Sequence, residues 1–545
     1  MKINLVSINS KFIHSSLAAL SISTMYGVYA EKLGTDMPEL TVTETTINDS
    51  FDSVVNSVMN GADIFAFSVY IWNVSLVERL CRHIRLALPE SIIILGGPEV
   101  SFGTDIPEEC FDYIISGEGE RAFFALVCEL NGTAVPEEWK FTADGKIRMA
   151  ENIPDLSEIA FPYSDENISD YDGRIVYYEA SRGCPFSCAY CLSSVCGKVR
   201  ELPLERVFSD LQFFIGHEIP QVKFVDRTFN CNRKRARRIW EHIINAENCE
   251  TNFHFEIGAD LLEEEDLQLL SSCPEGRIQL EAGIQSTFEP ALDECCRHTD
   301  TEKLFSNITE LVKNGNINIH VDLIAGLPYE TPDIFKKSFN DAYRLKAHQL
   351  QLGFLKLLHG APLNGMIRKH GYVFSAYPPY EIVKNSYVSF GDISKLKKIE
   401  DVLERFYNSN RFRRSLEKIK PLFDSPYEMF SFLAEEFEKR KLAFRAVSTK
   451  VLYNLLSEIF AEKIADIDKT LLLDFYTSEK SELVPSALRY LTGDGKAAVK
   501  SETQRGNKKA QVKFIENDAY IIDYSKRSPV DGNFKISEVI ENVYM

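Results

Sequence analysis

The pattern of hydrophobic and polar positions predicts a layered α/β domain over residues 1–135. Four short apolar runs are the expected strands: Ile3–Val6, Ile64–Phe67, Ile92–Leu95 and Tyr113–Ile115. Between the second and third of these runs, Val77–Leu88 has apolar residues at helical spacing. Strands that alternate with helices favour a parallel, Rossmann-like sheet, and such sheets bind ligands at the carboxyl ends of their strands.

A second series of strands and helices follows at residues 174–364, after a polar, proline-containing connector at residues 136–173. The six expected strands are Val176–Glu179, Val222–Val225, His254–Ile257, Ile278–Ala282, Ile319–Leu323 and Leu350–Phe354. Helical spacing recurs between them at Leu204–Phe214, Arg233–Asn245, Glu263–Ser271, Glu302–Lys313 and Asp333–Tyr343. Six such repeats predict a partial (β/α)6 barrel with its site at the carboxyl ends of the strands.

Residues 365–545 lose the strand signal and predict a mostly helical C-terminal domain. Three stretches have apolar residues at helical spacing: Leu396–Phe406, Tyr427–Lys439 and Thr449–Phe460. The expected fold class is therefore α/β, with a Rossmann-like N-terminal domain, a partial barrel and a helical C-terminal domain.

Charge excludes some classes of partner. The 545 residues include 80 acidic and 61 basic ones, which gives a formal net charge of −19. So acidic a surface disfavours bulk binding to nucleic acid or to an anionic membrane. The chain has no apolar run of about 18 residues, and its start lacks a signal-peptide pattern. We therefore expect a cytoplasmic protein with reduced cysteines and no membrane partner.

Three cysteines form the most informative motif. Cys184, Cys188 and Cys191 are spaced Cys-x3-Cys-x2-Cys directly after the first barrel strand. Three thiolates on so short a loop can hold three corners of a 4Fe–4S cluster and leave one iron open to a small molecule. A structural zinc site is the alternative, and it needs a fourth ligand, for which Cys196 is the nearest candidate.

This loop, with the aromatic Tyr190 before its third cysteine, resembles the cluster loop of the radical S-adenosylmethionine (SAM) superfamily. The resemblance implies that Cys184, Cys188 and Cys191 are the catalytic metal ligands. It also implies that the open iron binds the amino and carboxyl groups of SAM. Reduction of the cluster then splits SAM and yields a 5′-deoxyadenosyl radical, with a flavodoxin or ferredoxin as the electron donor.

Later strand ends resemble the SAM contacts of the same superfamily. Phe224–Asn230 stands where the family contacts the methionine amino group, although its usual Gly-Gly-Glu is absent. Glu281–Ser286 stands at the ribose contacts, and Asp322–Glu330 and Leu355–Leu357 stand at the adenine contacts. The resemblance thus implies SAM contacts at Tyr190, Asp226, Thr228, Asn230, Glu281, Gln285, Arg297, Ile324 and Leu357. Of these, Arg297 is the expected partner of the methionine carboxylate.

The N-terminal domain resembles that of the cobalamin-binding radical SAM class. The resemblance rests on Val69–Asn73, Gly96–Val100 and Gly117–Glu120, and it extends to a subgroup with its own C-terminal domain. Many cobalamin domains carry Asp-x-His-x-x-Gly, but here the one early histidine, His14, follows Phe12 and precedes Leu17. Cobalamin is thus one alternative, and a domain that keeps the fold without the cofactor is the other.

The resemblance implies hydrogen abstraction from a small-molecule substrate. The resembling subgroup includes queuine lyases of anaerobic bacteria, which release 7-aminomethyl-7-deazaguanine in queuosine salvage. A 7-deazaguanine base presents N–H donors, which a carboxylate would accept. The candidate carboxylates at the barrel mouth are Glu179, Glu256, Asp260 and Asp322.

Two further functions remain open. A cobalamin-dependent methyltransferase would deliver a methyl group to an unactivated carbon or phosphorus. A tRNA-modifying methylthiotransferase resembles this layout but carries three more N-terminal cluster cysteines. Here Cys81, Cys110 and Cys128 are widely spread in the sequence, and the net negative charge also disfavours a nucleic-acid substrate.

Overall fold

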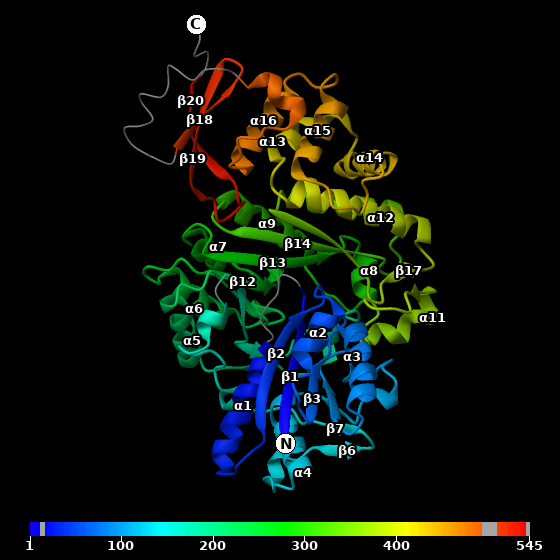
Figure 1. Cartoon of the computed structure of the whole chain (residues 1–545). Helices are drawn as coiled ribbons and strands as arrows, with labels where there is room; N and C mark the ends of the chain where they lie inside the picture. Colours follow the sequence, from blue (N-terminus) through cyan, green and yellow to red (C-terminus); the bar gives the residue numbers. More distant parts are fainter. Residues whose placement is uncertain (11–16, 172, 196, 493–509, 541–545) are drawn as a thin grey trace. The chain divides into compact units, whose positions relative to one another are not determined.

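The computed structural model describes residues 1–10, 17–171, 173–195, 197–492 and 510–540 (Figure 1). The chain divides into two compact units. The first unit comprises Met1–Gly258, Asp293–His298 and Leu355–Asn385. The second unit comprises Ala259–Leu292, Thr299–Phe354 and Ser386–Met545.

The N-terminal domain, in the first unit, is built on a seven-stranded sheet with strand order β2-β1-β3-β4-β5-β7-β6. Its strands are β1 (Lys2–Asn9), β2 (Glu39–Thr46), β3 (Ile64–Ser68), β4 (Ile92–Gly96), β5 (Tyr113–Ser116), β6 (Thr142–Asp144) and β7 (Ile147–Met149). All neighbours pair in parallel except β6 and β7, which are antiparallel. Its helices are α1 (Leu17–Leu33), α2 (Phe51–Val58), α3 (Val74–Ala87) and α4 (Gly119–Asn131).

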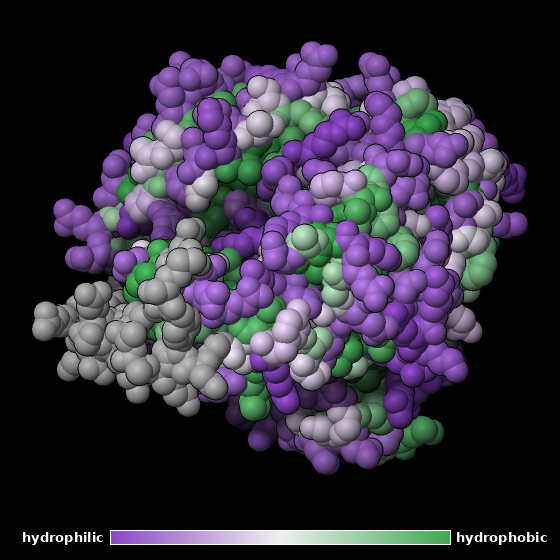
Figure 2. Space-filling view, turned by 90° about the horizontal axis from the view of Figure 1, so that it is seen from above, coloured by the Kyte–Doolittle hydropathy of each residue, from purple (hydrophilic) through white to green (hydrophobic). Residues whose placement is uncertain are grey.

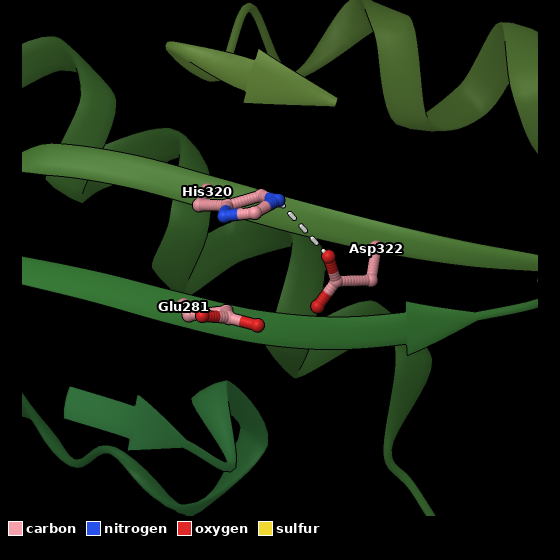
Figure 3. Close-up of side chains that lie close together, drawn as sticks. All are labelled: Glu281, His320 and Asp322. Atoms are coloured by element: carbon pink, nitrogen blue, oxygen red, sulfur yellow. Dashed lines mark ion pairs between the residues drawn. The ribbon is translucent and has the colours of Figure 1, made fainter. Parts of the chain in front are cut away.

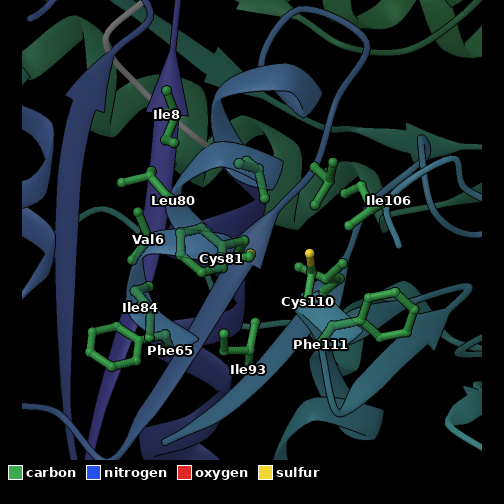
Figure 4. Packing of buried hydrophobic residues seen from close by; sticks show 14 of the residues in the cluster. Val6, Ile8, Phe65, Leu80, Cys81, Ile84, Ile93, Ile106, Cys110 and Phe111 are labelled. Atoms are coloured by element: carbon green, nitrogen blue, oxygen red, sulfur yellow. The ribbon is translucent and has the colours of Figure 1, made fainter. Parts of the chain in front are cut away.

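Helices cover both faces of this sheet because successive strand residues point to opposite sides. Val6 and Ile8 of β1 pack with α2 and α3, and Figure 4 shows this core. Ile3 and Leu5 of the same strand pack with α1 and α4 on the other face. This confirms the predicted Rossmann-like domain.

The structure corrects the interpretation of residues 136–173 as a plain connector. Strand β7 pairs in parallel with β5, so the β6–β7 hairpin extends the N-terminal sheet. Each of these strands has three residues, and five of the six are exposed. Strands this short and exposed have no apolar run that the hydrophobic pattern could reveal.

All six strands predicted for the barrel are present, three in each unit. In the first unit β11 (Gln221–Phe224) pairs in parallel with β8 (Ile175–Tyr178) and β12 (Asn252–Ile257). In the second unit β14 (Asn318–Ala325) pairs in parallel with β13 (Ile278–Gln285) and β15 (Gln349–Phe354). The barrel helices are α5 (Leu204–Gly216), α6 (Arg233–Ile244), α7 (Glu264–Ser271), α8 (Glu289–Glu294), α9 (Thr301–Asn314) and α10 (Pro332–Arg344).

The C-terminal region is mostly helical, as predicted. The first unit contains α11 (Ile367–His370) and the hairpin of β16 (Val373–Phe374) and β17 (Ile382–Lys384). The second unit contains α12 (Phe390–Leu403), α13 (Arg413–Ile419), α14 (Pro426–Lys439), α15 (Thr449–Phe460) and α16 (Ile467–Ser478). A π-helical segment, η9 (Glu404–Asn408), directly follows α12.

An antiparallel sheet of β18 (Ala510–Ile515), β19 (Asp518–Arg527) and β20 (Phe534–Ile540) ends the described chain. The sequence pattern did not predict it. Its outer strands have little buried surface: one residue in β18 and one in β20 is buried. Strands with so few buried positions give a weak periodic signal.

No helix within the described residues is long and apolar enough to cross a membrane. The face seen in Figure 2 is mainly hydrophilic, with hydrophobic residues in small scattered groups. Such scattered apolar residues are normal for a protein surface.

Candidate active site

The three cysteines lie on a loop that is held by the rest of the first unit. Strands β9 (Ser181–Arg182) and β10 (Arg200–Glu201) pair at its two ends. Gly183 has φ +108°, and a Cβ atom there would lie 2.8 Å from the carbonyl oxygen of Lys198, so only glycine fits without strain. In the middle of the loop, Ala189 donates its N–H to Cys295 and accepts one from Leu363, both at 2.8 Å.

The three thiols of the loop suit a metal cluster by their chemistry. Cys188 is buried, and Cys184 and Cys191 are half-buried. A 4Fe–4S cluster binds each cysteine at a different iron and can leave one iron open, whereas a structural zinc ion needs a fourth protein ligand. Cys196, the alternative zinc ligand, lies outside the described residues.

Arg297 lies beside the cluster loop. Burial raises the pKa of the Cys188 thiol, and the charge of the neighbouring Arg297 guanidinium acts in the opposite direction. The same guanidinium opposes the rise that burial causes in the pKa of Tyr190. Arg297 therefore neighbours two residues of the cluster motif, and its expected contact with the methionine carboxylate remains a prediction.

The predicted ammonium contacts divide into two kinds. Asp226 is 2% exposed, and its carboxylate accepts hydrogen bonds from Ala180 N at 2.9 Å and Ser181 Oγ at 2.5 Å. Asn230 bonds to both backbone groups of Gly258. These two side chains hold strand ends in place. Thr228 differs, because its Oγ1 lies 3.9 Å from Cys184 Sγ and so borders the cluster site.

The predicted ribose and adenine contacts lie on several strand ends. Gln285, in the second unit, has φ +66° and a buried Oε1 without a hydrogen-bond partner among the described residues. An orphaned acceptor at this position fits a hydroxyl of bound SAM. Ile324 lies near the end of β14. In the first unit Leu357 donates its backbone N–H to Tyr380 O at 3.1 Å, so its pairing with adenine remains a prediction.

The four candidate substrate carboxylates have different neighbours. Glu179 accepts from Arg182 Nε at 3.0 Å, and Glu256 lies 3.8 Å from Lys223 Nζ. Asp260 accepts from the backbone of Asp300 at 3.4 Å. Asp322 lies 3.1 Å from His320 Nε2, and both come within 4.8 Å of Glu281. Sequence reasoning missed His320, although it stands two residues before Asp322 and so shares its face of the strand.

An ion network joins the cluster loop to the N-terminal domain within the first unit. Arg182 Nη2 lies 2.8 Å from both Glu120 and Glu179, and Arg182 Nη1 lies 3.4 Å from Glu118. Arg200 also pairs with Glu118. Burial alone would raise the pKa of Glu120, but Arg182, together with hydrogen bonds from the backbone and from Ser21, acts in the opposite direction and the net shift is downward. The network places the cluster loop at the carboxyl end of β5.

The carboxyl edge of the N-terminal sheet offers features that suit a large ligand. Gly97 has φ +105°, and a Cβ there would lie 2.6 Å from Val69 O, so the loops after β3 and β4 touch only because glycine is present. Trp72 is 49% exposed and stacks on Tyr70 with ring centroids 4.3 Å apart. Glu99 is buried, and its Oε1 lies 3.7 Å from His359 Nε2. An exposed indole beside these close turns fits a large ligand such as a cobalamin. His14 lies outside the described residues.

Three protein-family profiles match consecutive parts of the chain. The B12 binding domain matches residues 5–127, the radical SAM superfamily matches residues 178–342, and a protein of unknown function, DUF4080, matches residues 368–528.

Residues 178–342 form a domain of the radical SAM superfamily. A radical SAM domain implies a 4Fe–4S cluster and SAM as cofactors, in agreement with the three thiols of the loop. The order of the matched domains along the chain is that of the cobalamin-dependent radical SAM enzymes.

Two curated relatives are methyltransferases. The 2-(S-pantetheinyl)-carbapenam-3-carboxylate methyltransferase of Streptantibioticus cattleyicolor is 24% identical over 58% of this radical SAM chain and 50% of its own. The cobalamin-dependent radical SAM methyltransferase TokK of Streptomyces tokunonensis is 22% identical over 55% of this chain and 48% of its own. The chain therefore spans about half the length of the curated relatives it matches.

Solved structures share the fold. The cobalamin-dependent SAM radical enzyme OxsB with aqua-cobalamin bound has a TM-score of 0.59 at 16% identity, over 90% of this chain and 83% of its own. The radical SAM methyltransferase TsrM of Kitasatospora setae, with tryptophan and a SAM analogue bound, has a TM-score of 0.53 at 16% identity, over 69% of this chain and 78% of its own.

Proposed function

We propose that this radical SAM protein is a cobalamin-dependent methyltransferase that modifies an unactivated carbon or phosphorus of a small molecule. The observation that carries the proposal is the ion network of Arg182 with Glu118 and Glu120. It fixes the cluster loop at the carboxyl edge of the domain that matches the B12 binding profile. The methyltransferase names of two relatives support the same reaction class and favour it over the lyase expected from the sequence.

In this proposal the residues of the chain would mainly hold the cofactors and orient SAM. When bound, the cluster and SAM supply a 5′-deoxyadenosyl radical, and cobalamin supplies the methyl group. Cys184, Cys188 and Cys191 would hold three irons, and Gln285 would orient SAM through its free Oε1. Trp72 would contact cobalamin at the edge of the N-terminal sheet.

Queuine cleavage is the second candidate. Its supporting observation is the group of Glu281, His320 and Asp322, whose ligand atoms lie within 4.8 Å of one another. Two carboxylates this close offer acceptors for the N1–H and 2-amino donors of a 7-deazaguanine. Cleavage would release 7-aminomethyl-7-deazaguanine and would need no cobalamin.

A methylthiotransferase is not favoured. Cys81 and Cys110 pack in the core on one face of the N-terminal sheet, whereas Cys128 packs in the core on the opposite face. The three thiols therefore do not meet at one site, as a second cluster would require.

Anaerobic turnover distinguishes the candidates. The protein with reconstituted cluster is incubated with SAM, reductant and queuine, with or without hydroxocobalamin, and the products are read by mass spectrometry. Retention of cobalamin at one per chain, with S-adenosylhomocysteine formed besides 5′-deoxyadenosine, supports the methyltransferase. Release of 7-aminomethyl-7-deazaguanine without cobalamin overturns it in favour of the lyase. A Cys188→Ala variant is the control and should form neither nucleoside product.

A further inference from the structure

Polar side chains line one face of β13, β14 and β15 in the second unit. Strand register places Glu281 opposite His320, and His320 opposite Gln349. Two residues further along β14, on the same face, Asp322 lies opposite Gly283 of β13 and Gln351 of β15. The opposite face of β13 and β14 is apolar and buried.

Negative charge gathers on this polar face. Figure 3 shows Glu281 on one strand and His320 and Asp322 on the next, with their polar ends directed toward one another. His320 Nε2 lies 3.1 Å from Asp322 Oδ1. The imidazole can therefore pair with the Asp322 carboxylate. The Glu281 carboxylate supplies a second acceptor, because the ligand atoms of the three residues lie within 4.8 Å of one another.

A hollow of about 240 Å³ borders His320. Its lining comprises His320, Gln349, Gln351, Glu404, Asn408 and Ser409. Three of these residues come from the barrel and three from the C-terminal region. The lining contains five neutral or histidine side chains and one carboxylate, with no lysine or arginine among them.

The π-helical segment η9 positions the C-terminal part of the lining. Asn408 accepts the backbone N–H of Leu350 at 2.9 Å and donates to its carbonyl oxygen at 3.0 Å, so it is bonded to the edge of β15. Asn408 also donates to Glu404 at 2.6 Å, which orients that carboxylate. π-Helical turns inside α-helices frequently occur at functional sites.

We propose that this hollow binds the substrate of the proposed enzyme, and that the substrate carries an ammonium group and further hydrogen-bond donors. The inference rests on the proposed function in calling the ligand the substrate, whereas the ligand chemistry follows from the lining. Glu404 would face the ammonium group, and the side-chain amides of Gln349 and Gln351 would accept from the other donors. An anionic ligand would meet the Glu404 carboxylate and no lysine or arginine of the lining, which is unfavourable.

Calorimetry with two probes tests the ligand class. The full chain with reconstituted cluster is titrated with 7-aminomethyl-7-deazaguanine, which carries an ammonium group, and with 7-deazaguanine, which has the same ring without it. We expect the ammonium probe to bind at least tenfold more tightly. Glu404→Gln keeps the acceptor for Asn408 and should reduce that preference to less than threefold. Glu435→Gln, an exposed carboxylate on α14, is the matched control and should leave the preference unchanged.

Three results would overturn the proposed binding site. The first is equal affinity for both probes, and the second is an undiminished preference in Glu404→Gln. The third is stoichiometric binding of Mn²⁺ alone that is lost in His320→Gln, which would make the group a metal site. SAM cleavage in the same preparations separates this proposal from the proposed function. Equal affinity for both probes in the native protein, with intact 5′-deoxyadenosine formation, refutes the binding site alone. A clear preference for the ammonium probe in the native protein, without methylated product, refutes only the methyltransferase.

Discussion

Replacing Arg182 by methionine tests the ion network that joins the cluster loop to the N-terminal domain. Methionine keeps part of the apolar stem and removes the guanidinium. Glu120 is 5% exposed, and its carboxylate then keeps the hydrogen bond from Ser21 Oγ, at 3.3 Å. Removing one partner of a buried ion pair costs about 3–5 kcal/mol because the other charge stays buried. We expect the lower limit, about 3 kcal/mol, because Glu120 lies in the first turn of α4, where the helix dipole favours a negative charge.

Amide hydrogen exchange is the appropriate assay, since a chain with several domains has no single free energy of unfolding. A loss of about 3 kcal/mol corresponds to exchange on the order of a hundredfold faster at the start of α4 and in the β9–β10 loop. Adding Glu120→Gln to Arg182→Met removes the unpaired charge and should recover part of the protection. Arg82→Met is the control: Arg82 forms an exposed pair with Glu78 on α3, and such pairs contribute about 0–1 kcal/mol.

If Arg182→Met speeds amide exchange at α4 by less than threefold, the Arg182 ion pairs do not stabilise the start of this helix as described. The pH dependence provides a second check. The folded-state pKa of Glu120 is lowered, so its stabilising contribution is present above its unfolded pKa and is lost as the pH falls through the folded value. Protection of α4 should therefore decrease on acidification in the native protein and respond less to acid in the double variant.

Three further predictions concern single residues. Burial raises the pKa of Glu330 to about 8, so between the unfolded and folded pKa values the folded state binds a proton that the unfolded state has lost. The free energy of unfolding should therefore fall by about 1.4 kcal/mol per pH unit as the pH rises through this range. Glu330→Gln should remove this pH dependence in melting curves. Cys188→Ala should abolish SAM cleavage while circular dichroism stays unchanged, and retained cleavage would contradict the cluster assignment. Gly183→Ala forces a Cβ to within 2.8 Å of Lys198 O, so iron content after reconstitution should drop, whereas Gly173→Ala, with open space around it, should bind iron normally despite its positive φ.

The elements that sequence reasoning predicted are those with local signals. The barrel strands carry apolar residues in short runs or at alternate positions, and α10 shows strong helical spacing from Phe335 to Tyr343. The cysteine loop was predictable because its three metal ligands are close in sequence. The pairing of β7 with β5 was not, because it depends on partners outside the segment. For the same reason the sequence did not reveal that Asp226 and Asn230 would be engaged by backbone groups.

The backbone bonds of Ala189 bear on how the cluster site is assembled during synthesis. Its N–H and carbonyl groups are bonded to Cys295 and Leu363, which a ribosome adds long after all three cluster cysteines. A nascent chain that ends before Cys295 thus has every sulfur ligand but lacks both backbone partners of the loop. Iron and sulfide are therefore expected to be inserted only after Leu363 has been synthesised and has folded against the loop, rather than as soon as the three cysteines emerge. Expression of fragments that end after the cysteines should yield protein that does not retain iron.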